Sequence, residues 1–235
     1  HLVEPTIQLI KYRSGRMNYE EILRLGEGAG GGPSPLVDFR QFRIDRGDVT
    51  IRVPWNPPDS LTTPARRDSA LAAQRAKPGR VIEEGRDGLQ RVIRLERLTA
   101  QFSPLTVSTP DHRPISAEID TLATRVSDPG VELVQARGRI RTPHDSLIFE
   151  ITRGALPHSR FTGAGAITWP DGPILFDFEL QMSEVDLADL RWVSPDFPAL
   201  HGRTDVTAKS ESATRTAYDL QNLHLENDST RVDGR

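Results

Sequence analysis

The feature that most constrains this chain is a series of short alternating segments that fills most of the sequence after residue 91. Apolar and polar residues alternate within them, and turn sequences rich in Pro, Gly and Asp separate them. Alternation with a period of two places the two sets of side chains on opposite faces of a strand. Regular short strands between turns predict an antiparallel, all-β architecture. The expected strands are 91–102, 105–109, 114–126, 131–142, 146–153, 159–169, 173–182, 202–209, 216–225 and 229–235.

The clearest alternation lies in the strand expected at 173–182, where five apolar residues alternate with mostly polar ones. The preceding strand has the same pattern, and the following strand adds one apolar residue. We expect these side chains to share one face of the sheet, where an apolar ligand could bind. The candidate groove residues are Phe161, Ile167, Ile174, Phe176, Phe178, Leu180, Met182 and Val206.

The first 53 residues predict a strand, a helix, a linker and a hairpin. Residues 1–12 are typical of an edge strand, because Pro5 lacks a backbone donor. Asn18 is expected to cap a short helix that ends near Leu25. A Gly- and Pro-rich linker follows at 26–35 and contains a GxGxxG match. A nucleotide role is not expected there, because such a match must follow a strand and open a helix.

Residues 36–53 predict a hairpin whose turn is Asp45–Asp48, and the Arg-Gly-Asp tripeptide inside that turn needs no adhesion role. The next stretch, 54–90, is interpreted as a polar insertion or flexible loop with a helix-prone segment at Arg66–Lys77. The chain is thus divided into three parts: 1–53, 54–90 and the repeating antiparallel β-groove segment 91–235. Within the last part, Val185–Leu190 suits a short helix or a crossing loop, with Asp186 as the expected cap.

Composition excludes several classes of function. The 30 basic and 33 acidic residues nearly balance, which argues against nucleic-acid binding driven by positive charge. There is no Cys, and the six histidines are scattered without metal-ligand spacing. No catalytic motif occurs in the sequence. We therefore expect no enzyme activity, no catalytic residue, no cofactor and no metal. No apolar run approaches the ~20 residues of a membrane-spanning helix, and the chain is interpreted as an internal piece of a longer protein.

Three stretches, in this order, resemble AsmA-family proteins. The opening strand, polar turn and short helix match at Pro5, Gly15, Asn18 and Leu23. A strand-turn-strand, 42–52, follows the variable linker, as it often does in the family. The stretch 185–208 resembles the connector of AsmA and TamB proteins, in which an apolar-acidic helix precedes P-x-L-x-G and a new strand. Its matching residues are Leu187, Leu190, Pro198, Leu200, Gly202 and Val206.

The resemblance covers most of 1–53 and 91–235. It implies an elongated, twisted antiparallel sheet, curled into an open groove (a β-taco) with a few short helices. It also implies a periplasmic protein, anchored to the inner membrane by a segment absent from this chain. Its expected partners are phospholipid acyl chains and the inner and outer membranes through parts outside this fragment, with an outer-membrane protein as a further candidate partner. The implied function is to conduct phospholipid between the two membranes.

An amphipathic sheet must cover its apolar face, either with a second sheet or with a ligand. Eight Phe and three Trp are few for a closed sandwich, and an aliphatic lining suits acyl chains. The sequence leaves two alternatives open. One is a scaffold or assembly module for outer-membrane proteins that acts through exposed strand edges. The other is a β-sandwich adhesin or carbohydrate-binding module.

Overall fold

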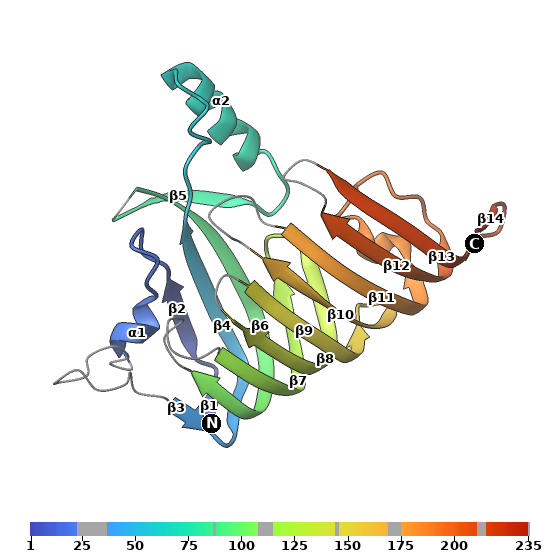
Figure 1. Cartoon of the computed structure of the whole chain (residues 1–235), viewed down its shortest axis with the longest axis horizontal. Helices are drawn as coiled ribbons and strands as arrows, with labels where there is room; N and C mark the ends of the chain where they lie inside the picture. Colours follow the sequence, from blue (N-terminus) through green and yellow to red (C-terminus); the bar gives the residue numbers. More distant parts are fainter. Residues whose placement is uncertain are drawn as a thin grey trace.

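The computed structural model of the chain describes residues 1–22, 37–86, 88–107, 115–143, 146–168, 175–210 and 215–234. Within these residues the fold is one mixed sheet of 14 strands, not closed into a barrel, and 65% of the structure is strand. Figure 1 shows the strands following one another along the long axis of the molecule, from the N-terminal end to the C-terminal end. The predicted all-β curled sheet is therefore confirmed.

The N-terminal elements are β1 (Leu2–Val3), β2 (Thr6–Ile10), α1 (Asn18–Ile22), β3 (Val37–Phe39), β4 (Phe42–Pro54), α2 (Pro64–Arg75) and β5 (Val81–Gly85). The central strands are β6 (Gly88–Val107), β7 (Ile115–Val126), β8 (Val131–Thr142), β9 (Ser146–Ala155) and β10 (Arg160–Thr168). The C-terminal elements are β11 (Leu175–Asp186), the 3₁₀ turn η1 (Leu187–Leu190), β12 (His201–Ser210), β13 (Thr216–Glu226) and β14 (Arg231–Asp233).

From β6 to β14 each strand pairs antiparallel with the next, which makes a simple meander. At the N-terminal end β1 and β2 pair parallel with β4, while β3 and β5 pair antiparallel with β6. The two strands predicted at 91–102 and 105–109 form the single strand β6. Pro104 is accommodated there because a register shift between Phe102 and Leu105 interrupts the ladder with β7.

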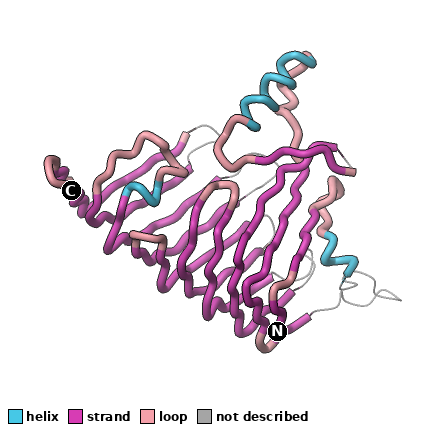
Figure 2. The backbone as a smooth tube through the Cα atoms, turned by 180° about the vertical axis from the view of Figure 1, so that it is seen from behind, coloured by secondary structure: helices cyan, strands magenta, loops and turns pink. Residues whose placement is uncertain are grey.

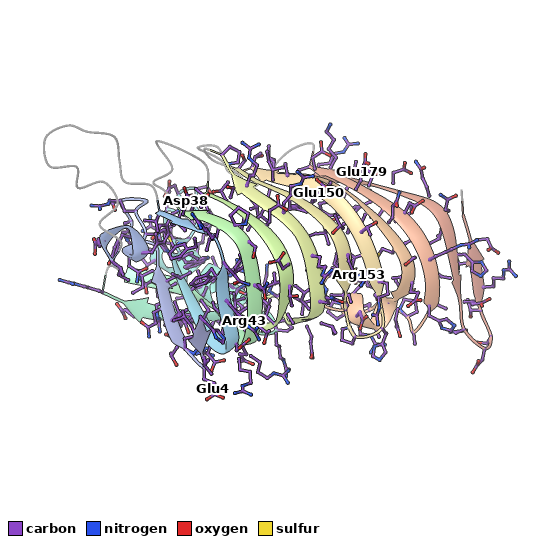
Figure 3. The ribbon with its side chains drawn as sticks, turned by 90° about the horizontal axis from the view of Figure 1, so that it is seen from below. Glu4, Asp38, Arg43, Glu150, Arg153 and Glu179 are labelled. Carbon is purple, nitrogen blue, oxygen red and sulfur yellow. The ribbon has the colours of Figure 1, made fainter. Side chains whose placement is uncertain are left out.

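Register shifts occur in every strand pair from β4–β6 to β12–β13. Arg46, Arg97 and Asn222 lie beside three of them with positive φ. An extra residue on one strand of a pair bends that strand and increases its twist. The shifts account for the strongly bent strands that Figure 3 shows.

The predicted hairpin at 36–53 is wrong. Residues 42–54 form one strand, β4, and Arg46 and Gly47 are the bulge within it. Gly47 approaches Pro5 so closely that a Cβ atom would lie 3.0 Å from the Pro5 Cγ atom. Turn-forming residues therefore supply a bulge here instead of a chain reversal, because bulges and turns need the same left-handed backbone.

Asn18 does not act as the predicted helix cap. Its side-chain oxygen accepts a hydrogen bond from the Ile10 N–H at 2.9 Å, and its amide donates to the Gln8 carbonyl at 2.9 Å. The side chain thus fastens the start of α1 to the outer side of β2. The predicted remainder of the helix and the linker 26–35 lie almost entirely outside the described residues.

The stretch 54–90, interpreted as a polar insertion or flexible loop, contains regular structure. The helix-prone segment forms α2, which has no buried residue and projects away from the sheet (Figure 1). A hairpin of β5 and the start of β6 follows. The Arg75 guanidinium donates to the Ile82 carbonyl and ties the helix to this hairpin. Backbone pairing orders the segment together with the burial of Ile82, which is 4% exposed.

A buried carboxylate joins this segment to the β7–β8 turn. Asp128 is 4% exposed and accepts from the Nε atoms of Arg80 at 3.0 Å and Arg91 at 2.6 Å. Burial alone would raise the pKa of Asp128, but the hydrogen bonds and charges of Arg91 and Arg80 outweigh it and lower the pKa. Asp128 is therefore ionised at neutral pH and bridges two parts of the chain.

Candidate functional site

The candidate site is one face of the sheet, on which apolar residues of successive strands lie directly opposite one another. Residues opposite each other in a ladder point to the same face, so the strand pairings connect side chains into rows across the sheet. One row crosses nine strands, from β4 to β13. It consists of Phe42, Phe102, Ile119, Gly138, Ile151, Gly163, Leu180, Val206 and Leu220.

Two further rows flank it. One consists of Leu105, Ala117, Ile140, Phe149, Gly165, Phe178, Ala208 and Tyr218. The other consists of Ile44, Ala100, Leu122, Ala136, Gly154, Phe161, Met182 and Thr204. We call the surface formed by these three rows the apolar face. At a strand spacing of ~4.8 Å its longest row is about 38 Å long, which exceeds the ~30 Å hydrocarbon core of a bilayer.

The opposite face is polar. Its corresponding row consists of Glu118, Arg139, Glu150, Ala164, Glu179, Thr207 and Asp219. Arg139 donates to Glu150 at 2.9 Å, and both side chains are about half exposed. Figure 3 marks Glu150 and Glu179 along the same edge of the bent sheet. The sheet is therefore amphipathic over almost its whole length.

Within the described residues, no second layer covers the middle of the apolar face. Each strand from β6 to β13 makes most of its contacts with its hydrogen-bonded neighbours, and β11 also contacts η1. Ile119 is nevertheless only 5% exposed. Since no described element lies over it, its burial comes from the adjacent side chains of the bent strands. The apolar face is thus partly sheltered by its own curvature.

Buried clusters lie at the two ends of the apolar face. The first contains Ile44, Val49, Leu98 and Ala100, with Ile7 and Leu9 of β2 packed against it. The second contains Met182, Val185, Leu200 and Leu225, with Leu187 and Leu190 of the connector packed against it. The connector, residues 187–200, lies across the C-terminal strands, as Figure 2 shows from behind. Between these clusters the apolar face is partly exposed, from Ile140 of β8 to Phe178 and Leu180 of β11.

The structure brings together seven of the eight predicted groove residues, and Ile174 lies outside the described residues. Met182 is buried in the second cluster, and Phe161 and Val206 pack against it. Ile167, Phe176, Phe178 and Leu180 are partly exposed on the same face. Phe176 and Phe178 stack with ring centroids 5.6 Å apart. Phe161 and Val206 are partly exposed too, but the latter four do not belong to the second cluster and, with the central part of the rows, form the candidate ligand surface.

Sequence reasoning missed the neighbouring residues that complete this surface. Phe149 and Ile151 of β9 lie opposite Gly165 and Gly163, and Ile140 of β8 lies opposite Phe149. Leu147, Phe149 and Ile151 alternate with Ile148, Glu150 and Thr152. This alternation indicates that Leu147, Phe149 and Ile151 share one face of β9. The pattern is weak, because Ile148 on the other face is also apolar.

Two glycines keep the floor of the apolar face low at β10. A Cβ atom on Gly165 would lie 2.3 Å from the Phe178 Cβ atom, and one on Gly163 would lie 2.3 Å from the Glu179 carbonyl oxygen. Phe178 and Leu180 therefore lean over β10 in space that any other residue would fill. The glycine spacing, alternating with Ala164 and Ala166, is a sequence signal for close packing between strands.

The connector is held at its start by a small polar network. Asp186 accepts a hydrogen bond from the Ala188 N–H, so its predicted capping role is confirmed. Asp189 accepts from the Ser159 hydroxyl at 2.8 Å and from the His158 N–H at 2.8 Å. These bonds fix η1 to the β9–β10 turn and position Leu187 and Leu190 over the second cluster.

The same network contains Ser, His and Asp, but its geometry does not suit nucleophilic catalysis. The Ser159 side chain is fully buried, donates to Asp189 instead of an imidazole, and accepts from the Asp186 N–H at 3.0 Å. A catalytic serine needs its hydroxyl hydrogen-bonded to a base and open to substrate. The network is a structural anchor for the connector.

Two shallow depressions lie on the polar face. The larger, about 420 Å³, is lined by residues including Arg141, Ile148, Ala166 and Asp177, and the smaller by residues including Glu118 and Arg137. In the part of the chain that the structure describes, no group of three or more His, Asp or Glu side chains could hold a metal ion. No helix among the described residues is long and apolar enough to cross a membrane.

Comparisons with family models, with curated proteins and with solved structures found no match to this chain. The resemblance to AsmA-family proteins therefore stays a prediction.

Proposed function

We propose that the chain binds lipid acyl chains on the apolar face and, without catalysing a reaction, conducts phospholipid along it. The observation that carries the proposal is the set of three in-register apolar rows, two of which cross eight strands and one nine. Burying apolar surface contributes about 25 cal/mol per Å². A face this long, left partly exposed between two buried clusters, is stabilised when an apolar ligand covers it.

The chemistry of the surface favours acyl chains over ligands with many polar groups. Ile140, Phe149, Ile151, Ile167 and Phe178 offer no side-chain hydrogen-bond donor or acceptor. An unpaired polar group on a ligand would lose its hydrogen bonds to water there. Rows that continue from strand to strand without a polar interruption would also let a chain slide along the face, because no position holds it by a specific bond.

The two apolar rows that end at Tyr218 and Leu220 lead to the C-terminal edge of the sheet. With the AsmA-like resemblance, this favours a segment of an envelope protein that lies in the periplasm between inner and outer membranes. In that setting the bound lipid is phospholipid in transit between them, and the membrane contacts are made by other parts of the protein. The periplasmic location, the phospholipid in transit and the membrane contacts are inferred from the AsmA-like resemblance.

The alternative of a β-sandwich adhesin or carbohydrate-binding module has less support. It requires a second sheet over the apolar face, and the described residues form one sheet. It would also place its ligand site in loops or on polar, aromatic surface, whereas the accessible part of this face is mainly aliphatic and phenylalanine.

Native mass spectrometry of the purified chain tests the proposal, with phospholipid retained by the wild type as the expected result. Phe178→Asp, on the apolar face, should lose most of the lipid while keeping a strand-rich circular dichroism spectrum. Gln181→Asp is the matched control, because it adds the same charge to the exposed opposite face of the same strand. A folded Phe178→Asp protein with a full lipid load would contradict the groove assignment, as would a wild type that takes up no lipid from phospholipid vesicles.

A further inference from the structure

Two arginines face each other on the polar face, in the middle of the sheet. Arg137 of β8 and Arg153 of β9 are direct partners in the antiparallel ladder. Such partners have Cβ atoms about 5 Å apart, and like charges there destabilise the strand pair. Both side chains are exposed, and neither makes a hydrogen bond or ion pair in the described part of the chain. Figure 3 shows Arg153 set apart from Glu150 and Glu179.

A bulge in β9 brings the two arginines together on this face. Between two consecutive positions of the apolar face, β9 has two residues, Thr152 and Arg153. The same interval holds only Arg137 on β8 and only Thr162 on β10. An extra residue of this kind redirects side chains. Because the apolar residues on either side keep their face, Thr152 and Arg153 both project from the polar face.

Uncharged donors surround the two arginines. Thr162 of β10 lies directly opposite Gln181 of β11, which continues the row. The side chains of Thr152, Thr162 and Gln181 are exposed and make no hydrogen bond to another described residue. We call this surface the donor patch, and it consists of Arg137, Thr152, Arg153, Thr162 and Gln181. Every member has an N–H or O–H donor, and none is a carboxylate.

The carboxylates that flank the donor patch already accept hydrogen bonds from other residues. Glu150 accepts from Arg139 at 2.9 Å, Asp120 from Gln101 at 3.2 Å, and Asp205 from Asn222 at 2.6 Å. Asp120 lines the smaller depression of the polar face together with Arg137 and Thr152, but no ion pair joins it to Arg137. Within the described residues, the charges of Arg137 and Arg153 therefore have no carboxylate partner.

We propose that the donor patch binds a phosphate group, with both guanidinium groups on its oxygens. Arginine binds phosphate through paired N–H···O bonds, and an anion between Arg137 and Arg153 would relieve their repulsion. A tetrahedral phosphate presents oxygens in several directions, so the hydroxyls of Thr152 and Thr162 can donate to the same group. A planar carboxylate presents only two oxygens. The ligand is a phosphate ester, from either a phospholipid headgroup or a soluble compound.

Titration of the intact chain with inorganic phosphate, at constant ionic strength, tests the proposal. The side-chain N–H signals of Arg137 and Arg153 should shift saturably in NMR spectra, with phosphate binding about fivefold tighter than acetate. Arg137→Gln and Arg153→Gln should each weaken binding about tenfold. Arg141→Gln is the matched control, since Arg141 is exposed on the same face of β8 but lies opposite Ile148, and it should change affinity less than about twofold.

Thermal melting provides a second readout of the same pair. Without phosphate, Arg153→Gln should melt at or above the wild-type temperature, because the substitution removes the opposed like charges. Phosphate should raise the melting temperature of the wild type but not that of the variant. A lower melting temperature for Arg153→Gln without phosphate would overturn the proposal. So would the absence of a saturable shift, equal binding of acetate, or an equal loss of affinity in Arg141→Gln.

Two further probes distinguish the source of the phosphate group. Glycerol 3-phosphate is a soluble ester, and vesicles of phosphatidylcholine and phosphatidylglycerol present headgroups. Co-flotation with vesicles that falls in Arg153→Gln but not in Arg141→Gln assigns a lipid headgroup. Binding of glycerol 3-phosphate, with co-flotation unchanged in Arg153→Gln, assigns a soluble compound. Either result supports the phosphate site, and failure of both probes contradicts it.

The phosphate site and lipid binding by the apolar face can fail separately, because they lie on opposite faces of the sheet. Phe178→Asp should lose phospholipid in native mass spectrometry while its affinity for inorganic phosphate stays unchanged. Gln181→Asp should show the reverse, since it adds a negative charge beside Thr162 in the donor patch. It should keep its lipid load and bind phosphate more weakly than the wild type.

Discussion

Two regions of the apolar face have the same alternating sequence pattern but different burial. In the N-terminal region Ile44, Val49, Leu98 and Ala100 are at most 5% exposed, because β2 supplies additional apolar side chains on the outer side of β4. In the β9–β12 region Ile167, Phe176, Phe178 and Leu180 stay partly exposed, and no described element covers them. One sheet thus combines a packed core with a surface suited to a ligand, and mutations can test this difference.

The largest expected effect is that of a charge placed in the packed region. Ala100→Asp buries an unpaired carboxylate among Ile44, Val49 and Leu98, which costs several kcal/mol and is comparable with the whole stability of a domain. The variant should fail to fold, as measured by circular dichroism and thermal melting. Ala217→Asp, on the exposed polar side of β13 opposite Lys209, should melt near the wild-type temperature. A folded Ala100→Asp protein would show that this region is not a core.

A substitution at the floor of the partly exposed region should have a smaller effect. Gly165→Val forces atoms into space held by the Phe178 side chain and the Asp177 carbonyl, which costs about 1–3 kcal/mol of unfolding free energy. Urea denaturation measures the loss. Ala166→Val, the adjacent residue on the opposite face, should change stability by less than about 0.5 kcal/mol. Equal losses in the two variants would mean that the close packing over β10 is unimportant.

The charge that unfolds the packed region should be tolerated in the partly exposed one. Phe178→Asp loses the stack with Phe176 but leaves a carboxylate that water can reach, so we expect a loss of about 1–2 kcal/mol. Thermal melting of the lipid-free protein measures it. Phe178→Ala separates the lost packing from the added charge. Complete unfolding of Phe178→Asp, with Phe178→Ala still folded, would show that this region is closed as tightly as the first.

Acid should act first at the β7–β8 turn, through Asp128. Its pKa in the folded chain lies below the ordinary value of 3.8, because Arg91 and Arg80 outweigh the effect of burial. The stability that this carboxylate contributes is therefore fully present above that ordinary value and is lost as pH falls through the lowered pKa. Hydrogen exchange at low pH should show earlier loss of protection around the β7–β8 turn than in β10 and β11. Asp128→Asn should abolish that difference; its persistence in the variant would assign the acid sensitivity to other groups.

Strand positions after residue 115 were largely predictable. The predicted strand 131–142 coincides with β8, and 216–225 differs from β13 by one residue, because turn residues bound both of them. The helix-prone segment and the Asp186 cap were predicted for the same local reason. Two predictions were wrong. Asp45–Asp48 can form either a turn or a bulge, and it forms a bulge. Asn18 can either cap a helix or hydrogen-bond to the edge of a strand, and it bonds to β2. Only the partners brought by other strands decide between these uses.

Alternation correctly predicted that the groove residues share one face of the sheet. It could not predict which of them remain accessible to a ligand. Met182 and Phe178 occupy equivalent positions in the alternation of one strand, yet one lies in a cluster covered by the connector and the other remains partly exposed. Phe149 and Ile151 join the site only through the register of β9 with β10. Register depends on where each strand shifts by a residue, and no single strand contains that information.

A largely antiparallel, amphipathic sheet could be predicted from the sequence, because turn residues and a period of two act locally on each segment. Pairing between strands decides which apolar residues align into rows, where the strands bend, which end of the apolar face is packed, and that Asn18 occupies the outer side of β2. These properties arise from pairing between segments far apart in the chain. Their energies belong to pairs of strands and to no segment alone.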